Sequence, residues 1–77
     1  MSIVLFYDEK KQIMAKVGDK TCPMGELFLG LMFANDKQIH ELLGETQPEV
    51  IVEGDSAELT EAKRQSDEIL ASYYNKK

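Results

Sequence analysis

The chain has 77 residues, of which 43% are hydrophobic and 30% charged, and its formal net charge is −5 at pH 7. This length and balance predict one globular domain over residues 1–77 and exclude wholesale disorder. A negative net charge repels phosphate, and lysine and arginine occur at most as adjacent pairs. The sequence therefore predicts no direct binding of nucleic acid.

The cysteine content and the amino terminus bear on where the protein works. A single cysteine cannot form an internal disulfide, and the first residues lack the basic segment and long apolar run of a secretion signal. The most apolar run is interrupted by Glu26 and Gly30 and is too short to span a bilayer. We therefore expect a cytoplasmic protein with no membrane segment and no membrane partner.

The first seventeen residues predict a β-hairpin. Residues 2–7 are nearly all apolar and include β-branched and aromatic types, which is typical of a central strand, covered on both faces or paired on both edges. A charged turn follows at residues 8–11. Residues 13–17 then alternate as a half-buried strand does, so they are predicted to pair with the first strand.

The most apolar stretch of the chain predicts a central helix over about residues 23–34. A glycine-containing turn precedes it, and Thr21 or Cys22 is expected to cap its first turn. The polar pair at residues 35–36 predicts a break in the helix. A short continuation over residues 37–43 then ends at a glycine.

The predicted central helix is apolar on two sides. Leu29 and Phe33 lie one turn apart and point away from the side expected to face the sheet, and Met32 lies at the edge. Either the domain covers this second side itself, or these residues contact another chain, because exposed apolar patches often mark interfaces. The side expected to face the sheet consists of Met24, Leu27, Phe28, Leu31 and Ala34.

The last part of the chain predicts a strand and a long helix. Residues 50–52 are β-branched and lie between a proline and a glycine, which favours a third strand near residues 49–53. Asp55 or Ser56 is then expected to cap a helix over about residues 56–75. The apolar face of this helix is predicted to contain Leu59, Ala62, Ser66, Ile69, Leu70, Tyr73 and Tyr74.

Together these elements predict an α+β fold. A small three-stranded sheet, with residues 2–7 in the middle, is expected to pack against the central and C-terminal helices. The orientation of the third strand stays open, because it depends on the path of the chain through the break at residues 35–36.

Cys22 is the candidate catalytic residue, because a thiol near the amino end of a helix has its thiolate favoured by the helix dipole. No second cysteine offers a redox pair, and a lone cysteine is commonly a small buried apolar residue. His40 could serve as its base, but nothing in the sequence brings the two together. The histidine, cysteine and carboxylates are dispersed, and the glycines form no phosphate-binding loop, so no metal and no cofactor are predicted.

The sequence favours a small acidic protein-interaction module without enzymatic activity, which forms a homodimer or binds and occludes a larger protein partner. Two alternatives stay open: a thiol-dependent enzyme or redox sensor that uses Cys22, and an acidic antitoxin or nucleic-acid mimic that captures a basic partner. Tyr74 is expected either to anchor the partner or to dock the last helix on its own sheet. The residues predicted to contact a partner are Leu29, Met32, Phe33 and Tyr74.

Overall fold

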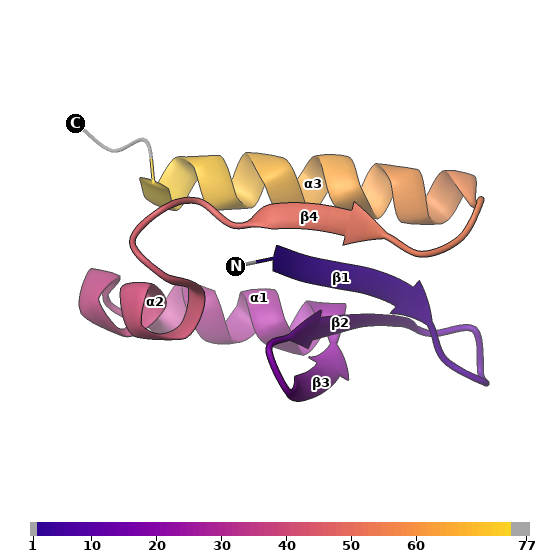
Figure 1. The fold of residues 1–77 in the computed structure, drawn as a ribbon, viewed down its shortest axis with the longest axis horizontal. Helices are drawn as coiled ribbons and strands as arrows, with labels where there is room; N and C mark the ends of the chain where they lie inside the picture. Colours follow the sequence, from indigo (N-terminus) through magenta and orange to yellow (C-terminus); the bar gives the residue numbers. More distant parts are fainter. Residues whose placement is uncertain (1, 75–77) are drawn as a thin grey trace.

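The computed structural model describes residues 2–74. Figure 1 shows one long helix along the upper edge of the strands and two shorter helices along their lower edge in that view. The four strands follow the order β3-β2-β1-β4. The predicted α+β class is therefore confirmed. The elements are β1 (Ser2–Tyr7), β2 (Ile13–Val17), β3 (Lys20–Pro23), α1 (Met24–Phe33), α2 (Asp36–Leu43), β4 (Glu49–Val52) and α3 (Ala57–Tyr74).

β1 is an interior strand of the sheet and is paired on both edges, as predicted. It pairs with β2 in antiparallel orientation and with β4 in parallel orientation, which settles the orientation that the sequence left open. Ile3 lies opposite Val17 on one side and Val50 on the other, and Leu5 is wholly buried. Side chains alternate along a strand, so this register directs one apolar row of each strand toward the same core.

The prediction of three strands was wrong, because the sheet has a fourth, β3. A two-residue turn over Gly18 and Asp19 joins β2 directly to β3, and Val17 lies opposite Lys20. Gly18 has a φ of 60°, a conformation that glycine adopts without steric cost. Since β3 continues to Pro23, that proline is the cap position of α1 and offers no side-chain hydrogen bond. The predicted cap at Thr21 or Cys22 is therefore wrong.

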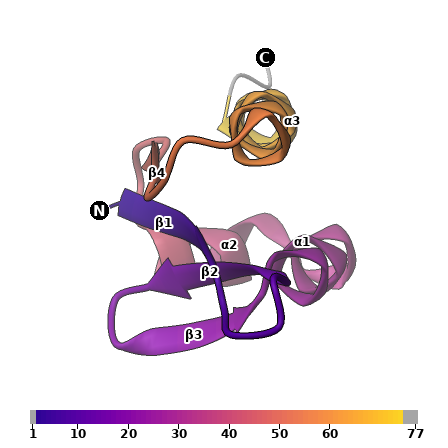
Figure 2. The same ribbon diagram turned by 90° about the vertical axis from the view of Figure 1, so that its right-hand side faces the viewer.

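The helices cover only one face of the sheet. Figure 2 shows α1 and α3 on the same side of the strands. α1 packs against β2 and β3, whereas α3 packs against β4 and β1. The buried hydrophobic residues form one core between the sheet and these helices, and they are Ile3, Leu5, Ala15, Val17, Leu27, Phe28, Leu31, Ile39, Leu43, Val50, Leu59, Ala62 and Leu70.

The predicted break between the two shorter helices is confirmed, and a capping box explains it. The Asn35 side chain accepts a hydrogen bond from the Gln38 backbone N–H at 2.8 Å, and the Gln38 side chain accepts one from the Asn35 backbone N–H at 3.0 Å. These two bonds satisfy backbone donors at the start of α2, so a new helix begins there. α2 ends at Gly44, whose φ is 94°.

α3 begins where the sequence predicted, and of the two expected caps the structure uses Ser56. Its hydroxyl accepts a hydrogen bond from the Glu58 backbone N–H at 3.2 Å and is bonded to the Tyr7 hydroxyl at 2.9 Å. The end of β1 is thereby tied to the start of α3. The predicted helix extended to about residue 75, which lies outside the described residues, and α3 is described to Tyr74.

The two faces of α3 differ sharply in polarity. The predicted apolar face is confirmed, since Leu59, Ala62, Ser66 and Leu70 are buried. The outer face carries exposed ion pairs: Lys63 lies 2.9 Å from Asp67, and Arg64 pairs with both Glu61 and Glu68. Among residues 2–74, no helix combines the length and the apolarity needed to cross a membrane.

Candidate functional site

Three large apolar side chains project from α1 into solvent. Leu29 is 54% exposed, Met32 69% and Phe33 83%. The other side of the same helix buries Leu27, Phe28 and Leu31 against the core. We call Leu29, Met32 and Phe33 the α1 patch. The alternative that the last helix covers these residues is excluded by their exposure, because α3 packs over β4 and β1 instead.

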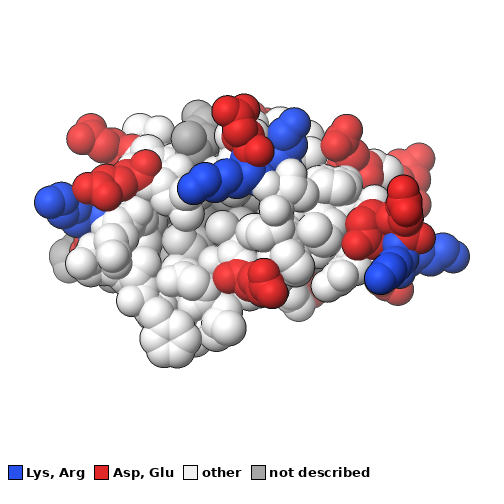
Figure 3. All heavy atoms as spheres, turned by 90° about the horizontal axis from the view of Figure 1, so that it is seen from below, with Lys and Arg blue, Asp and Glu red and all other residues white. Residues whose placement is uncertain are grey.

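The helix period explains how the α1 patch forms. Leu29 and Phe33 are four residues apart, so their side chains stack along one row of the helix. Gly30 is exposed beside this row, and a Cβ atom added to it would meet nothing within 4 Å. Figure 3 views the molecule from the side of α1 and α2 and shows a broad uncharged area there, with an acidic side chain near its centre.

A second apolar surface, which the sequence did not reveal, lies on the face of the sheet that no helix covers. Val4 lies opposite Ile51 of β4, and Phe6 lies opposite Met14 of β2. Ile51 is 40% exposed, and the other three are partly exposed. We call these four residues the open sheet face. β1 is thus paired on both edges, as one of the two sequence interpretations held, but helices cover only one of its faces.

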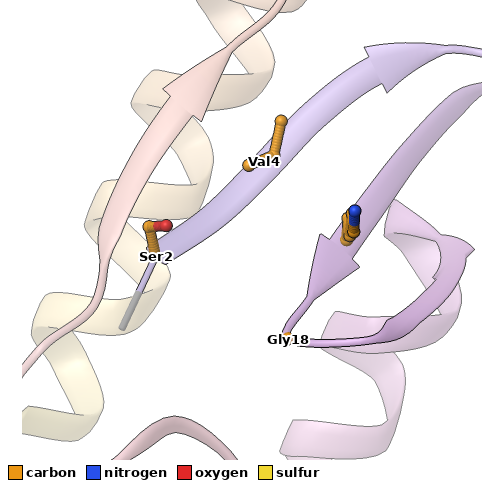
Figure 4. Close-up of a pocket in the computed structure, with 4 residues that line it drawn as sticks. Ser2, Val4 and Gly18 are labelled. Atoms are coloured by element: carbon orange, nitrogen blue, oxygen red, sulfur yellow. The ribbon is translucent and has the colours of Figure 1, made fainter.

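A shallow hollow of about 310 Å³ lies at one end of the open sheet face, where Val4 belongs to both. Figure 4 shows Ser2 and Val4 projecting from β1 toward it, with Gly18 at the end of β2. Its remaining lining residue is Lys16, which lies opposite Val4. These four lining residues provide one amine and one hydroxyl but no carboxylate or imidazole to act as a base.

Cys22 lies in β3, two residues before the first residue of α1, and is partly buried. Burial raises the pKa of its thiol above the ordinary value, and the nearby Glu26 carboxylate raises that pKa further. The expectation that the helix would favour the thiolate is therefore wrong. Nor does the structure make His40 its base, because the His40 ring lies in α2 against Tyr74, with ring centroids 5.5 Å apart.

We expect Cys22 to react with iodoacetamide at neutral pH more slowly than an unstructured cysteine peptide. The thiolate is the nucleophile, so a raised pKa lowers the reactive fraction at neutral pH. The rate should therefore still be rising above pH 9.0, the ordinary pKa of this group. Glu26→Gln removes a charge that opposes the thiolate and should increase the neutral rate. Rates against pH, followed by mass spectrometry, check this; a rate above that of the peptide would contradict it.

Tyr74 joins the end of α3 to the end of α2. Its hydroxyl donates a hydrogen bond to the Gly44 carbonyl oxygen at 2.9 Å, and its ring lies against His40. Partial burial raises the pKa of this hydroxyl. These contacts are with the end of α2 rather than with the sheet on which the last helix was expected to dock. Tyr74 is not part of the α1 patch.

Neither a metal site nor a known relative points to a function for this chain. Within the described range, 2–74, no group of three or more histidine, cysteine, aspartate and glutamate side chains is arranged to hold a metal ion. Comparisons of the chain with protein-family models, with curated proteins and with solved structures each give no match. The α1 patch is therefore identified by its exposure and chemistry alone.

Proposed function

We propose that this chain is a small acidic protein-interaction module, cytoplasmic and without enzymatic activity, which binds a protein partner through the α1 patch. The observation that carries this proposal is the 83% exposure of the Phe33 side chain. Burying an aromatic or aliphatic side chain of this size stabilises a protein by about 1.5–3 kcal/mol. A partner that covers Phe33, Met32 and Leu29 would recover this stabilisation, which the isolated chain forgoes.

The long helix α3 shows that the apolar character of α1 is not shared by every exposed helix of the chain. The outer face of α3 carries Glu61, Arg64 and Glu68 in mutual ion pairs. At corresponding outward positions α1 carries leucine, methionine and phenylalanine. Solubility favours the first pattern, whereas a protein-binding surface favours the second.

The two alternative functions have less support. An enzyme or redox sensor that uses Cys22 needs an accessible thiolate, and burial together with Glu26 raises the pKa of this thiol. A nucleic-acid mimic presents an unbroken acidic surface to a basic partner, whereas the outer face of α3 mixes Glu61, Asp67 and Glu68 with Lys63 and Arg64. An interaction through apolar side chains requires neither condition.

Photo-crosslinking tests the proposal. Phe33 is replaced by the photoreactive aromatic residue p-benzoylphenylalanine, in cells that naturally express the chain. The same residue at Gln65, on the exposed outer face of α3, is the matched control. We expect irradiation to give one adduct of defined mass from position 33 and none from position 65.

The mass of the adduct distinguishes a second copy of this chain from a different protein. An adduct with any single protein, including a second copy, supports an interaction module. The proposal is overturned if position 33 gives no adduct, or if positions 33 and 65 give the same weak smear of products.

A further inference from the structure

We propose that the partner of the α1 patch is a second copy of this chain, and that the two α1 helices pack antiparallel about a two-fold axis. This inference rests on the proposed function, because it specifies the occupant of the same surface. In this arrangement Leu29 lies opposite the partner's Phe33, and the reverse contact follows by symmetry. The axis then passes at the level of Leu31, midway between the two residues.

The charge distribution of α1 favours the antiparallel orientation. Between Met24 and Phe33 the one charged residue is Glu26, and it is exposed. In a parallel pair the two Glu26 side chains would lie at the same level. In the antiparallel pair each lies five residues from the axis, so they are about 15 Å apart along the helices at 1.5 Å per residue. Beyond a Debye length of about 8–10 Å, exposed like charges repel each other little.

The shape of the surface fits the same arrangement. With 3.6 residues per turn, Met32 lies on one border of the Leu29–Phe33 row and Gly30 on the other. A two-fold axis perpendicular to both helices places each border of this row beside the same border of the partner helix. Met32 therefore contacts the partner's Met32. On the other border, Gly30 faces the partner's Gly30, where the absence of side chains lets the helices approach closely. Because a Cβ atom on Gly30 would meet nothing in its own chain, this space is open to a second one.

Other occupants fit the α1 patch less well. A basic protein surface would need several carboxylates around the patch, whereas α1 supplies only Glu26. An anionic membrane attracts helices with lysine and arginine beside their apolar face. The segment Met24–Phe33 has neither residue, and the chain has a net charge of −5. An uncharged apolar partner surface matches best, and a second α1 patch is such a surface.

An interface built on three apolar side chains from each copy indicates a weak dimer. The largest apolar patch on a monomer typically covers about 300–600 Å². Two such patches bury less than or about as much as the 1,200 Å² at which specific stable interfaces begin. We therefore expect association in the micromolar range or weaker, so that the oligomeric state depends on protein concentration.

Sedimentation equilibrium on the purified full chain, from about 1 μM to 1 mM, tests the dimer. The mass of the wild-type chain should rise from 8.7 kDa toward twice that value. Phe33→Asp should remain monomeric throughout. Ile51→Asp, on the open sheet face, is the control for an exposed apolar residue outside the interface, and it should dimerise as the wild type does.

Substitutions at Gly30 test the orientation without destabilising the chain. Glutamate and lysine are better helix formers than glycine, so neither Gly30→Glu nor Gly30→Lys should lower the melting temperature of the monomer. Each alone brings like charges together across the axis and should weaken the dimer by about tenfold or more. An equimolar mixture of the two variants should associate more strongly than either variant alone, because each glutamate then meets a lysine across the axis. In a parallel pair, residue 30 of one copy and residue 30 of the other lie on opposite sides of the interface. Mixing the two variants would then not restore association.

The possible outcomes separate this inference from the proposed function. A wild-type chain that stays monomeric to 1 mM, about the weakest association expected here, overturns the dimer. A photo-crosslink from position 33 to a different protein also overturns it but leaves the interaction module standing. Loss of the dimer in Ile51→Asp, with retention in Phe33→Asp, would move the interface to the open sheet face. A Gly30 mixture that associates no better than either variant alone would overturn the antiparallel orientation.

Discussion

Replacing Leu43 with alanine is expected to lower the free energy of unfolding by about 2–5 kcal/mol. Leu43 is the last residue of α2 and is wholly buried in the common core. Its truncation leaves a cavity that the surrounding side chains fill only in part, so both burial and packing are lost. A domain of this size is stable by only about 5–15 kcal/mol, so this single change removes a large share of the total.

Leu42 provides a matched control for Leu43, because it is the preceding residue of the same helix and 37% exposed. Leu42→Ala removes the same atoms but opens no enclosed cavity, so its cost should be well below 2 kcal/mol, the lower end of about 2–5 kcal/mol for buried leucines. Urea unfolding of both variants gives the comparison through the shift in midpoint at unchanged slope. Equal losses in the two variants would show that α2 is not docked as the structure has it.

Gly44→Ala is expected to lower the free energy of unfolding by about 1–3 kcal/mol. Gly44 has φ 94° and ψ 173°, a conformation that side-chain-bearing residues rarely adopt. The same residue makes two bonds that hold the helices. Its backbone N–H donates to the His40 carbonyl oxygen at 2.8 Å, and its carbonyl oxygen accepts the Tyr74 hydroxyl. An altered backbone there therefore loosens the ends of both α2 and α3.

Gly30→Ala is the corresponding control in a regular helix. Gly30 has open space around it and ordinary helical geometry, so alanine should raise the free energy of unfolding by about 0.5–1 kcal/mol. Thermal unfolding of both glycine variants at about 1 μM, the lower end of the range expected for a weak dimer, limits the contribution of self-association. A stabilised Gly44→Ala would mean that the turn after α2 adopts a different conformation.

Most of the fold could be predicted because local signals agreed with the tertiary arrangement. The alternation of residues 13–17 and the cap at Ser56 define elements that packing then reinforces. β3 was missed although a signal existed. Gly18 and Asp19 form a glycine-first two-residue turn, which is typical of a hairpin, but the following four residues are too short to show alternation.

The candidate site could be predicted only in part. The helix period alone shows that Leu29 and Phe33 point away from the core side of α1. Whether anything covers them depends on where α3 lies, and β4 fixes that by pairing parallel to β1. The open sheet face could not be predicted from the sequence for a related reason. The strand pattern is apolar on both faces, so Val4 and Phe6 could not be distinguished from Ile3 and Leu5 before the helices were placed.

The parallel pairing of β1 with β4 also bears on the order in which the chain folds. β1, β2, β3 and α1 occupy the first 33 residues and contact one another locally. The other edge of β1 pairs with β4, which begins only at Glu49. Contacts between distant segments form slowly, because a long loop must close first. Until Glu49–Val52 arrives, the central strand has an unpaired edge, which is the structural feature most prone to pairing with other chains. The period of greatest aggregation risk therefore ends when β4 docks and α3 closes over the core.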